Sequence, residues 1–215
     1  GMDYPLRTHP KPWIDDSTTY FEHMSTGGTS LSLREARILA DRIVGILTPV
    51  CTRIEIAGSI RRGKPWVNDI EIVLTPKTTT VQRELVIVEG DIFTGREVEY
   101  YEELVRDPAY EAAVLKLAET VVRGAKISTA KYTQITIEGG VKVDLFTARP
   151  ENWGYILAIR TGPAEYSQGL LGRGNRLGFK GVDGMWTRNG MPVNVPEERT
   201  VFELLGINYT QPSDR

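Results

Sequence analysis

Cysteine and histidine are scarce in this sequence. Its 215 residues include one cysteine, Cys51, which excludes a disulfide framework or a thiolate zinc cluster within one chain. The two histidines, His9 and His23, are too few to form a histidine-rich metal site by themselves. Any metal ion bound by this chain must therefore be a hard cation held mainly by carboxylates.

A strong charge imbalance and long apolar runs are also missing. Lys and Arg total 26 against 28 Asp and Glu, and the net charge of −2 excludes a uniformly basic nucleic-acid binder while leaving a local basic face open. No apolar run is long enough to span a bilayer, and the N-terminus has no apolar signal region. These absences predict an intracellular, cytoplasmic chain with no membrane partner.

The hydrophobic pattern predicts both helices and strands. Ser32 and Glu35 form a capping box that starts a helix, and Pro49 ends it. Further helices are predicted over 108–122, 163–171 and 196–205. Strands are predicted near 53–57, 69–74, 83–88, 132–138, 141–146 and 154–160, with hairpin turns at 139–140 and 189–190.

These elements do not alternate in a regular strand–helix–strand rhythm. The sequence therefore predicts an α+β fold in which helices flank a mixed β-sheet. Residues 1–30 show little periodicity and are predicted to be an irregular lead-in, followed by a sheet domain over 31–150. That domain contains an acidic insertion near 76–107, partly helical at 97–106, and a small α/β unit follows over 151–215.

Three carboxylates are predicted to lie on one face of the sheet. Asp69 and Glu71 are two residues apart on a strand, so their side chains point the same way. Asp144 lies within the strand over 141–146, and the three acids converge if the two strands pair. Carboxylates in such proximity repel one another unless they share a cation. Two Mg²⁺ ions held by acids and phosphate oxygens are typical of phosphoryl or nucleotidyl transfer.

A glycine–serine turn precedes the carboxylate strand. Gly58 allows the backbone to approach a phosphate closely, and Ser59 offers a hydroxyl and an N–H donor. Arg62 can neutralise a terminal phosphate with its planar fork of donors. A nucleoside triphosphate fits this pattern, with its phosphates on the turn and metal ions between them and the acids.

These residues resemble the nucleotidyltransferase superfamily and, within it, the family X DNA polymerases of the DNA polymerase beta type. The family motif Gly-Ser-x-Arg-Arg-Gly is matched at 58–63, and Asp69 and Asp144 match the first and third family acids. The C-terminal part, from the Thr-Gly turn at 161–162 to the tail at 209–215, is similar to the family thumb. The resemblance implies a nucleotidyltransferase palm over 31–150 and a thumb-like domain over 151–215.

The resemblance also implies a reaction. A nucleoside monophosphate would pass from a (d)NTP to the 3′-hydroxyl of a nucleic acid, DNA being favoured, with release of pyrophosphate. Asp69, Glu71 and Asp144 would be the catalytic residues and would hold two Mg²⁺ ions, or Mn²⁺ in their place. Asp144 would also help to draw the proton from the attacking hydroxyl.

The remaining site residues follow from the same resemblance. The nucleotide would be bound by Gly58, Ser59, Arg62, Asn68, Thr161 and Gly162. The nucleic-acid backbone would lie along Arg173, Arg176 and Lys180, within a segment rich in basic residues.

The chain departs from the family at several positions. The second acid is Glu71, where the family usually has Asp, and the aromatic pair expected before the Thr-Gly turn is replaced by Ile159 and Arg160. Two alternatives therefore stay open. One is transfer to a tRNA end, a small molecule or a protein, and the other is a degenerate nucleotide-binding module without turnover.

Overall fold

The computed structural model describes residues 30–87 and 97–215, so the predicted lead-in over 1–30 lies almost wholly outside the described residues. The helices are α1 (Leu33–Leu47), α2 (Gly58–Arg61), α3 (Pro108–Leu117), α4 (Trp153–Thr161), α5 (Ala164–Arg176) and α6 (Glu198–Leu205). The strands are β1 (Leu31–Ser32), β2 (Cys51–Ile56), β3 (Trp66–Val67), β4 (Asp69–Pro76), β5 (Thr78–Ile87), β6 (Glu97–Arg106), β7 (Thr120–Arg123), β8 (Tyr132–Ile137), β9 (Val141–Thr147), β10 (Phe179–Val182), β11 (Met185–Arg188) and β12 (Met191–Pro192).

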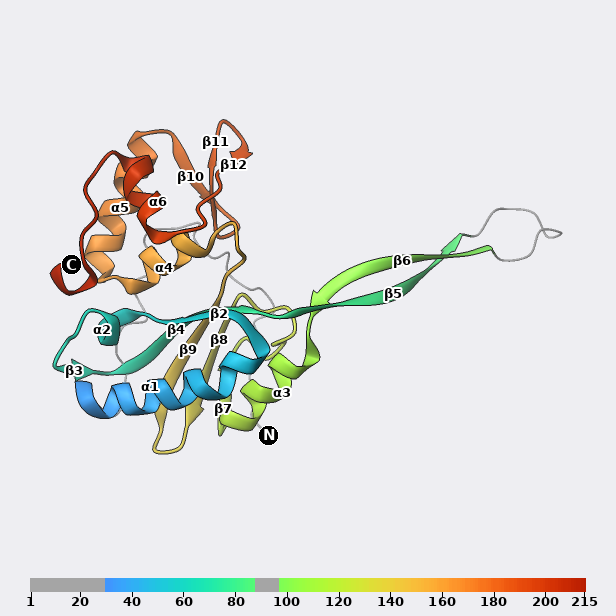
Figure 1. Ribbon diagram of the computed structural model, residues 1–215, viewed down its shortest axis with the longest axis horizontal. Coiled ribbons are helices and arrows are strands. Elements are labelled where there is room, and N and C mark those ends of the chain that lie inside the picture. The colour runs from blue at the N-terminus through green and yellow to red at the C-terminus, as the bar shows by residue number, and fades with distance from the viewer. Residues whose placement is uncertain (1–29, 88–96) are drawn as a thin grey trace, which may run out of the picture.

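A five-stranded sheet in the order β2-β4-β9-β8-β7 forms the centre of the molecule (Figure 1). β4 and β9 are parallel, whereas the other neighbouring pairs are antiparallel, so the sheet is mixed as predicted. Helices α1 and α3 cover one face and close a core with the apolar side chains of β4, β8 and β9. The protein is therefore an α+β protein with a mixed sheet.

Helix α1 begins where the sequence predicts. The Ser32 hydroxyl accepts a hydrogen bond from the Glu35 backbone N–H, while the Glu35 carboxylate accepts one from the Ser32 N–H. Both bonds satisfy donors that the first turn of a helix leaves without partners. Ala36, Ala40 and Ile43 point into the core, so the capped helix has a fixed start and a fixed buried face.

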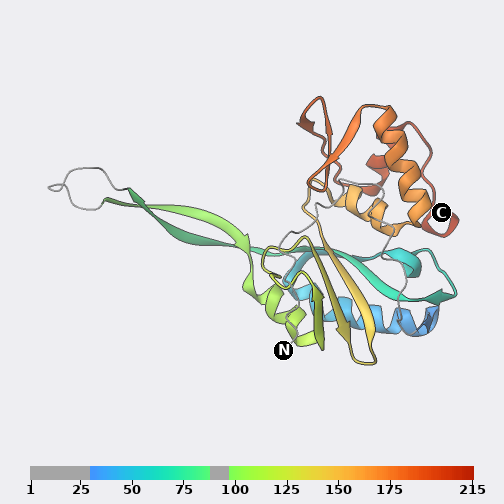
Figure 2. The same cartoon turned by 180° about the vertical axis from the view of Figure 1, so that it is seen from behind.

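The C-terminal elements pack on the other face of the sheet. Figure 2 shows helices α4, α5 and α6 and the β10-β11-β12 sheet together on this side of the molecule. The helices and strands β10 and β11 share a second core around the buried Trp153 and Trp186. Val73 of β4 and Phe146 of β9 belong to this core, which joins the C-terminal elements to the central sheet. One face of the sheet thus meets α1 and α3, and part of the opposite face meets α4.

Strands β5 and β6 form a separate antiparallel pair that projects from the body of the protein (Figures 1 and 2). The prediction of a partly helical stretch over 97–106 is wrong, because this segment is β6 and pairs along its whole length with β5. Its glutamates favour helix, but the cross-strand backbone hydrogen bonds decide the outcome. The described part of the acidic insertion is a two-stranded arm.

Two further predictions are corrected. Residues 154–160 form helix α4 rather than a strand, and almost all of its side chains are buried. The helix predicted over 108–122 ends at Leu117, after which β7 joins the edge of the sheet beside β8. No helix within the described residues is long and apolar enough to cross a membrane.

Candidate active site

The three predicted acids occupy neighbouring positions on one face of the central sheet. Strands β4 and β9 run parallel with Glu71 opposite Asp144, and Asp69 is opposite Lys142. Alternate residues of a strand point to opposite faces, so Ile70 and Ile72 enter the core beneath the acids. The strand pairing that the sequence analysis requires for convergence is therefore present.

All three acids have a raised pKa. Burial, together with the neighbouring charges of Asp69 and Asp144, raises the pKa of Glu71 to about 8. Burial and the charge of Asp144 likewise raise the pKa of Asp69, and burial raises that of Asp144. Each ionised carboxylate on this face therefore disfavours the ionisation of its neighbours. A shared cation would relieve this repulsion.

Two side chains that the sequence analysis did not identify hold Asp144. Tyr132 Oη and Gln134 Nε2, both on β8, donate hydrogen bonds of 2.7 and 2.8 Å to the same oxygen, Oδ1. The Tyr132 ring stacks on Phe146 with 5.0 Å between centroids, and the Arg160 guanidinium lies 3.9 Å from the Phe146 centroid. Asp144 is thus fixed by two donors at Oδ1, and Arg160 extends the stack beside the acids.

The glycine–serine turn forms α2, directly beside β4. Gly58 is buried and has φ +61°, a left-handed conformation that favours glycine. A methyl group at this position would overlap the carboxylate of Glu71. The close approach explains why the long side chain of Glu71 requires glycine at position 58, and it places the turn against the second acid.

Replacing Gly58 with alanine is expected to destabilise the protein by about 1–3 kcal/mol, because the new side chain occupies a strained φ and displaces the Glu71 carboxylate. Urea unfolding followed by circular dichroism measures this change. Gly45→Ala is the matched control, since no atom lies within 4 Å of a Cβ there and the position is helical. The control is expected to stabilise by about 0.5–1 kcal/mol. Equal changes in the free energy of unfolding at the two positions would contradict the packing of Glu71 on Gly58.

Arg62 connects the turn to the Thr-Gly segment. Its Nη1 donates a hydrogen bond of 2.5 Å to the Thr161 carbonyl oxygen, and its Nε is buried without a hydrogen-bond partner. Burial lowers the pKa of Arg62, while the charges of Glu71 and Asp69 oppose the shift. A buried donor without a partner, close to carboxylates, is consistent with a site that receives an anion such as a phosphate.

The other predicted nucleotide-binding residues differ in burial and in hydrogen bonding. Ser59 is half-buried in α2, and Asn68 is exposed immediately before β4. Thr161 is fully buried, and its hydroxyl donates to the Leu157 carbonyl and accepts from Arg61, so it serves the fold. Gly162, with φ +63°, ends α4 beside Arg62.

A buried ion cluster, also missed by the sequence analysis, anchors the same turn. Arg61 donates two hydrogen bonds to Glu198 of α6, at 2.7 and 2.8 Å. Arg215 donates to Glu198 Oε1 at 2.7 Å and Tyr209 Oη to Oε2 at 3.0 Å. One carboxylate thereby joins α2, α6 and the segment that ends at Arg215. Charge pairs between residues this distant in sequence give no local signal from which to predict them.

The three predicted nucleic-acid contacts differ in exposure. Arg173 is half-buried and donates to the Leu205 carbonyl at 2.7 Å, so its guanidinium stabilises the end of α6. Arg176, at the end of α5, and Lys180, on β10, are exposed. Of the predicted set, these two side chains are the ones exposed at the surface.

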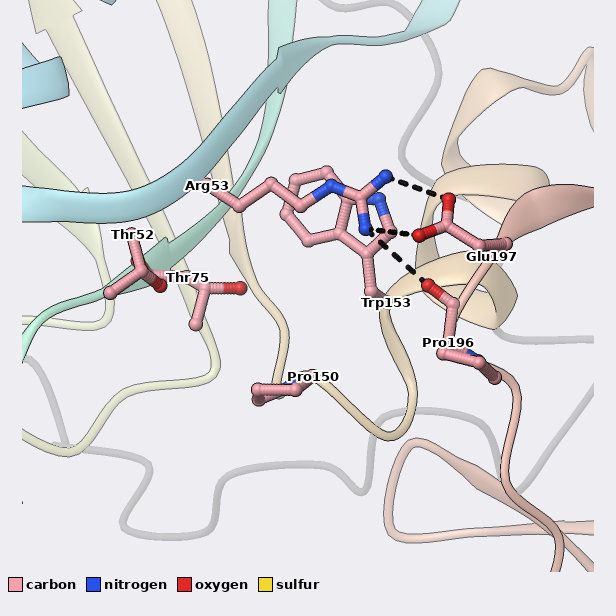
Figure 3. Close-up of a pocket in the computed structure, with 7 residues that line it drawn as sticks. All are labelled: Thr52, Arg53, Thr75, Pro150, Trp153, Pro196 and Glu197. Atoms are coloured by element: carbon pink, nitrogen blue, oxygen red, sulfur yellow. Dashed lines mark hydrogen bonds and ion pairs between the residues drawn. The ribbon is translucent and has the colours of Figure 1, made fainter.

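A pocket of about 310 Å³ lies away from the acids, at the edge strand β2 (Figure 3). Arg53 crosses it, donating to both carboxylate oxygens of Glu197 and stacking 4.4 Å from the centroid of Trp153. The guanidinium therefore lines the pocket and ties β2 to the segment before α6. We assign this pocket a structural role.

The donor set at the acids fits a hard cation. Within residues 30–87 and 97–215, no three Asp, Glu, His or Cys side chains lie close enough together to hold a metal ion between them. The carboxylate oxygens of the three acids are nevertheless ligands of the kind that Mg²⁺ and Mn²⁺ prefer. Burial raises the pKa of the Cys51 thiol to about 12, which disfavours the thiolate form that metal binding and nucleophilic attack require.

Comparison with known proteins gives no assignment. No protein-family model matches the chain, and no curated protein matches it. The interpretation of the site therefore depends on the geometry and charge of its residues.

Proposed function

We propose that the chain is a metal-dependent nucleotidyltransferase of the family X DNA polymerase type, with a palm that includes the mixed sheet and a thumb-like C-terminal domain. The observation that supports this most strongly is the pairing of Glu71 with Asp144 on parallel strands, with Asp69 on the same face. The Gly58–Ser59 turn lies against Glu71, and Arg62 lies between the turn and the Thr-Gly segment.

In the proposed reaction, the 3′-oxygen of the acceptor forms a bond to the α-phosphorus of a (d)NTP. The bond from that phosphorus to the bridging oxygen breaks, and pyrophosphate leaves. When bound, two Mg²⁺ or Mn²⁺ ions would neutralise the phosphates and bring the attacking and leaving oxygens into line. Asp69 and Glu71 would hold both ions, and Asp144 would bind one and help to draw the proton from the attacking hydroxyl. Ser59, Arg62 and Asn68 would bind the β- and γ-phosphates.

A nucleic-acid 3′-end is the acceptor we favour, with DNA ahead of RNA. The exposed Arg176 and Lys180 offer positive charge to a phosphate backbone near the C-terminal domain. Transfer to a tRNA end, a small molecule or a protein uses the same chemistry at phosphorus and differs only in the group that supplies the hydroxyl.

A nucleotide-binding module without turnover is the second candidate. It is favoured by the position of Glu71, whose carboxylate packs against the Gly58 backbone. A carboxylate held there is less free to move toward a metal ion than one on a shorter side chain. In that case the nucleotide would bind with metal but no bond to the α-phosphorus would form.

Primer extension tests the proposal. The purified chain is incubated with a labelled primer, alone or on a gapped template, with Mg²⁺ or Mn²⁺ and each dNTP or NTP. Templated addition would support a minimal polymerase, and untemplated tailing would support a terminal transferase. No extension, together with nucleotide binding in the presence of Mn²⁺, would favour the binding module or another acceptor.

Tyr132→Phe is expected to weaken metal binding and activity about tenfold, because partners that orient metal ligands typically contribute 10–100-fold. The phenylalanine retains the stacking on Phe146 and removes only the hydrogen bond to Asp144 Oδ1. Electron paramagnetic resonance of Mn²⁺, with a nucleotide analogue bound, measures the affinity without turnover. Tyr166→Phe is the matched control, since Tyr166 is half-buried on α5 rather than on the acid face. Equal Mn²⁺ affinities in wild type and Tyr132→Phe would contradict an orienting role.

A further inference from the structure

The arm formed by β5 and β6 leaves the sheet at the end opposite to the acids. Strand β4 begins at Asp69 and ends at Pro76, and β5 begins at Thr78, only two residues later. Figure 1 shows the two strands extending well beyond the body of the protein. A molecule bound along the arm would therefore leave the acid face accessible.

The arm exposes large apolar side chains on both of its faces. Leu104 is 69% exposed and Tyr100 is 63% exposed. Both lie on one face of the ribbon, where their cross-strand partners are Thr80 and Glu84. Leu85 and Tyr101, each 49% exposed, lie on the other face. A two-stranded ribbon has no core of its own in which to bury such groups. Exposed tyrosines and leucines grouped on one projection are typical of a protein interface.

The charged side chains of the described part of the arm are mainly acidic. Glu84, Glu99, Glu102 and Glu103 are exposed, and the matching positive charge is Arg83, which forms a 2.7 Å ion pair with Glu103. Arg106, at the base, is half-buried and donates to the carbonyl oxygens of Ile127 and Ala130. The described, exposed part of the arm thus has a surplus of negative charge around its apolar residues.

We propose that the arm is a docking site for a protein partner with a positively charged surface and an apolar groove. The tyrosines and leucines would fill the groove, and the glutamates would meet lysines and arginines around it. Phosphate backbones would be repelled by the same glutamates, and two arms laid against each other would bring like charges together. The proposal concerns the end of the sheet away from the acids and does not depend on the proposed nucleotidyl transfer.

Site-specific photocrosslinking tests the proposal. The full chain is made in its native cells with p-benzoylphenylalanine in place of Tyr100, on the arm, or of Ile38, which is 60% exposed on α1. Crosslinked proteins are identified by mass spectrometry. The expected result is one basic protein crosslinked from position 100 and absent from position 38. No crosslink from position 100, or a crosslink to a second copy, an acidic protein or nucleic acid, would overturn the proposal.

The identified protein is then purified and its affinity measured with arm variants. The double substitution Tyr100→Ser and Leu104→Ser is expected to weaken binding by about tenfold or more, since buried aromatic and apolar anchors dominate interfaces. Ile38→Ser, an equally exposed apolar position, is expected to change it little. The affinity of the chain for this partner should also fall as the salt concentration is raised. An affinity unchanged by the double substitution, with circular dichroism showing the native fold, would refute the docking site.

Discussion

Replacing Asp69 with asparagine is expected to abolish nucleotidyl transfer, with a loss of more than about 10³-fold. Removing a single preorganised electrostatic contact in an enzyme costs about 10²–10³-fold, and Asp69 is proposed to hold both metal ions. Asparagine retains the shape of the side chain but lacks its charge. Primer extension with Mg²⁺ and with Mn²⁺ measures the loss.

The same substitution is expected to leave the protein at least as stable as the wild type. Burial and the nearby Asp144 raise the pKa of Asp69, so in the absence of metal its charge disfavours the native state. An inactive variant with retained or increased stability is typical of a residue that serves function rather than folding. Asp41→Asn is the matched control, because Asp41 is exposed on α1, the helix that packs on the opposite face. Activity that survived Asp69→Asn with metal present would show that the carboxylate assignment is wrong.

The elements with strong local signals could be predicted from the sequence. The capping box at Ser32 fixes the start of α1, and Asp107 caps α3 by accepting a hydrogen bond from the Ala109 N–H. Asn189 and Gly190 both have positive φ between β11 and β12, as a two-residue hairpin turn requires. In each case the atoms that decide the structure lie within a few residues of one another.

Helix α4 and strand β6 could not be predicted in this way. The run over 154–160 is almost continuously apolar, and such a run suits a buried strand and a buried helix equally. The segment over 97–106 is rich in glutamate, which favours helix in isolation, yet β5 offers it ten consecutive pairing partners. Here the packing environment, and not local preference, determines the element.

In the candidate site, too, local features could be predicted from the sequence and contacts between distant segments could not. The spacing of Asp69 and Glu71 on one strand predicts a shared face, and the structure has that face. The donors to Asp144 depend on the register of β8 against β9, which is set by the hairpin and is not visible in residue types alone. The partners of Glu198 come from α2 and from the last residues of the chain, so only the folded structure brings them together.

Replacing Glu198 with glutamine is expected to destabilise the protein by about 3–5 kcal/mol, because removing one partner of a buried ion pair leaves the other charges uncompensated. Arg61 and Arg215 both donate to this carboxylate, and the Arg215 side chain is fully buried. Urea unfolding at neutral pH measures the change. Glu197→Gln is the matched control, since the adjacent glutamate makes a similar two-bond contact with Arg53 at the surface. The exposed pair is expected to contribute less than about 1 kcal/mol.

The pH dependence of the stability lost in Glu198→Gln distinguishes a contribution from the charge of Glu198 from one made by the packing of its side chain. Burial alone would raise the pKa of Glu198, but the hydrogen bonds and charges of Arg61 and Arg215 outweigh it and hold the pKa below its ordinary value of 4.5. A carboxyl group with a lowered native pKa contributes stability above its unfolded pKa and loses that contribution as pH falls through its native pKa. The stability gap between wild type and Glu198→Gln is therefore expected to be largest near neutral pH and to shrink below pH 4.5. Other carboxylates titrate in both proteins and cancel in the difference. A gap that stays constant as the pH falls would show that Glu198 acts through packing and not through its charge.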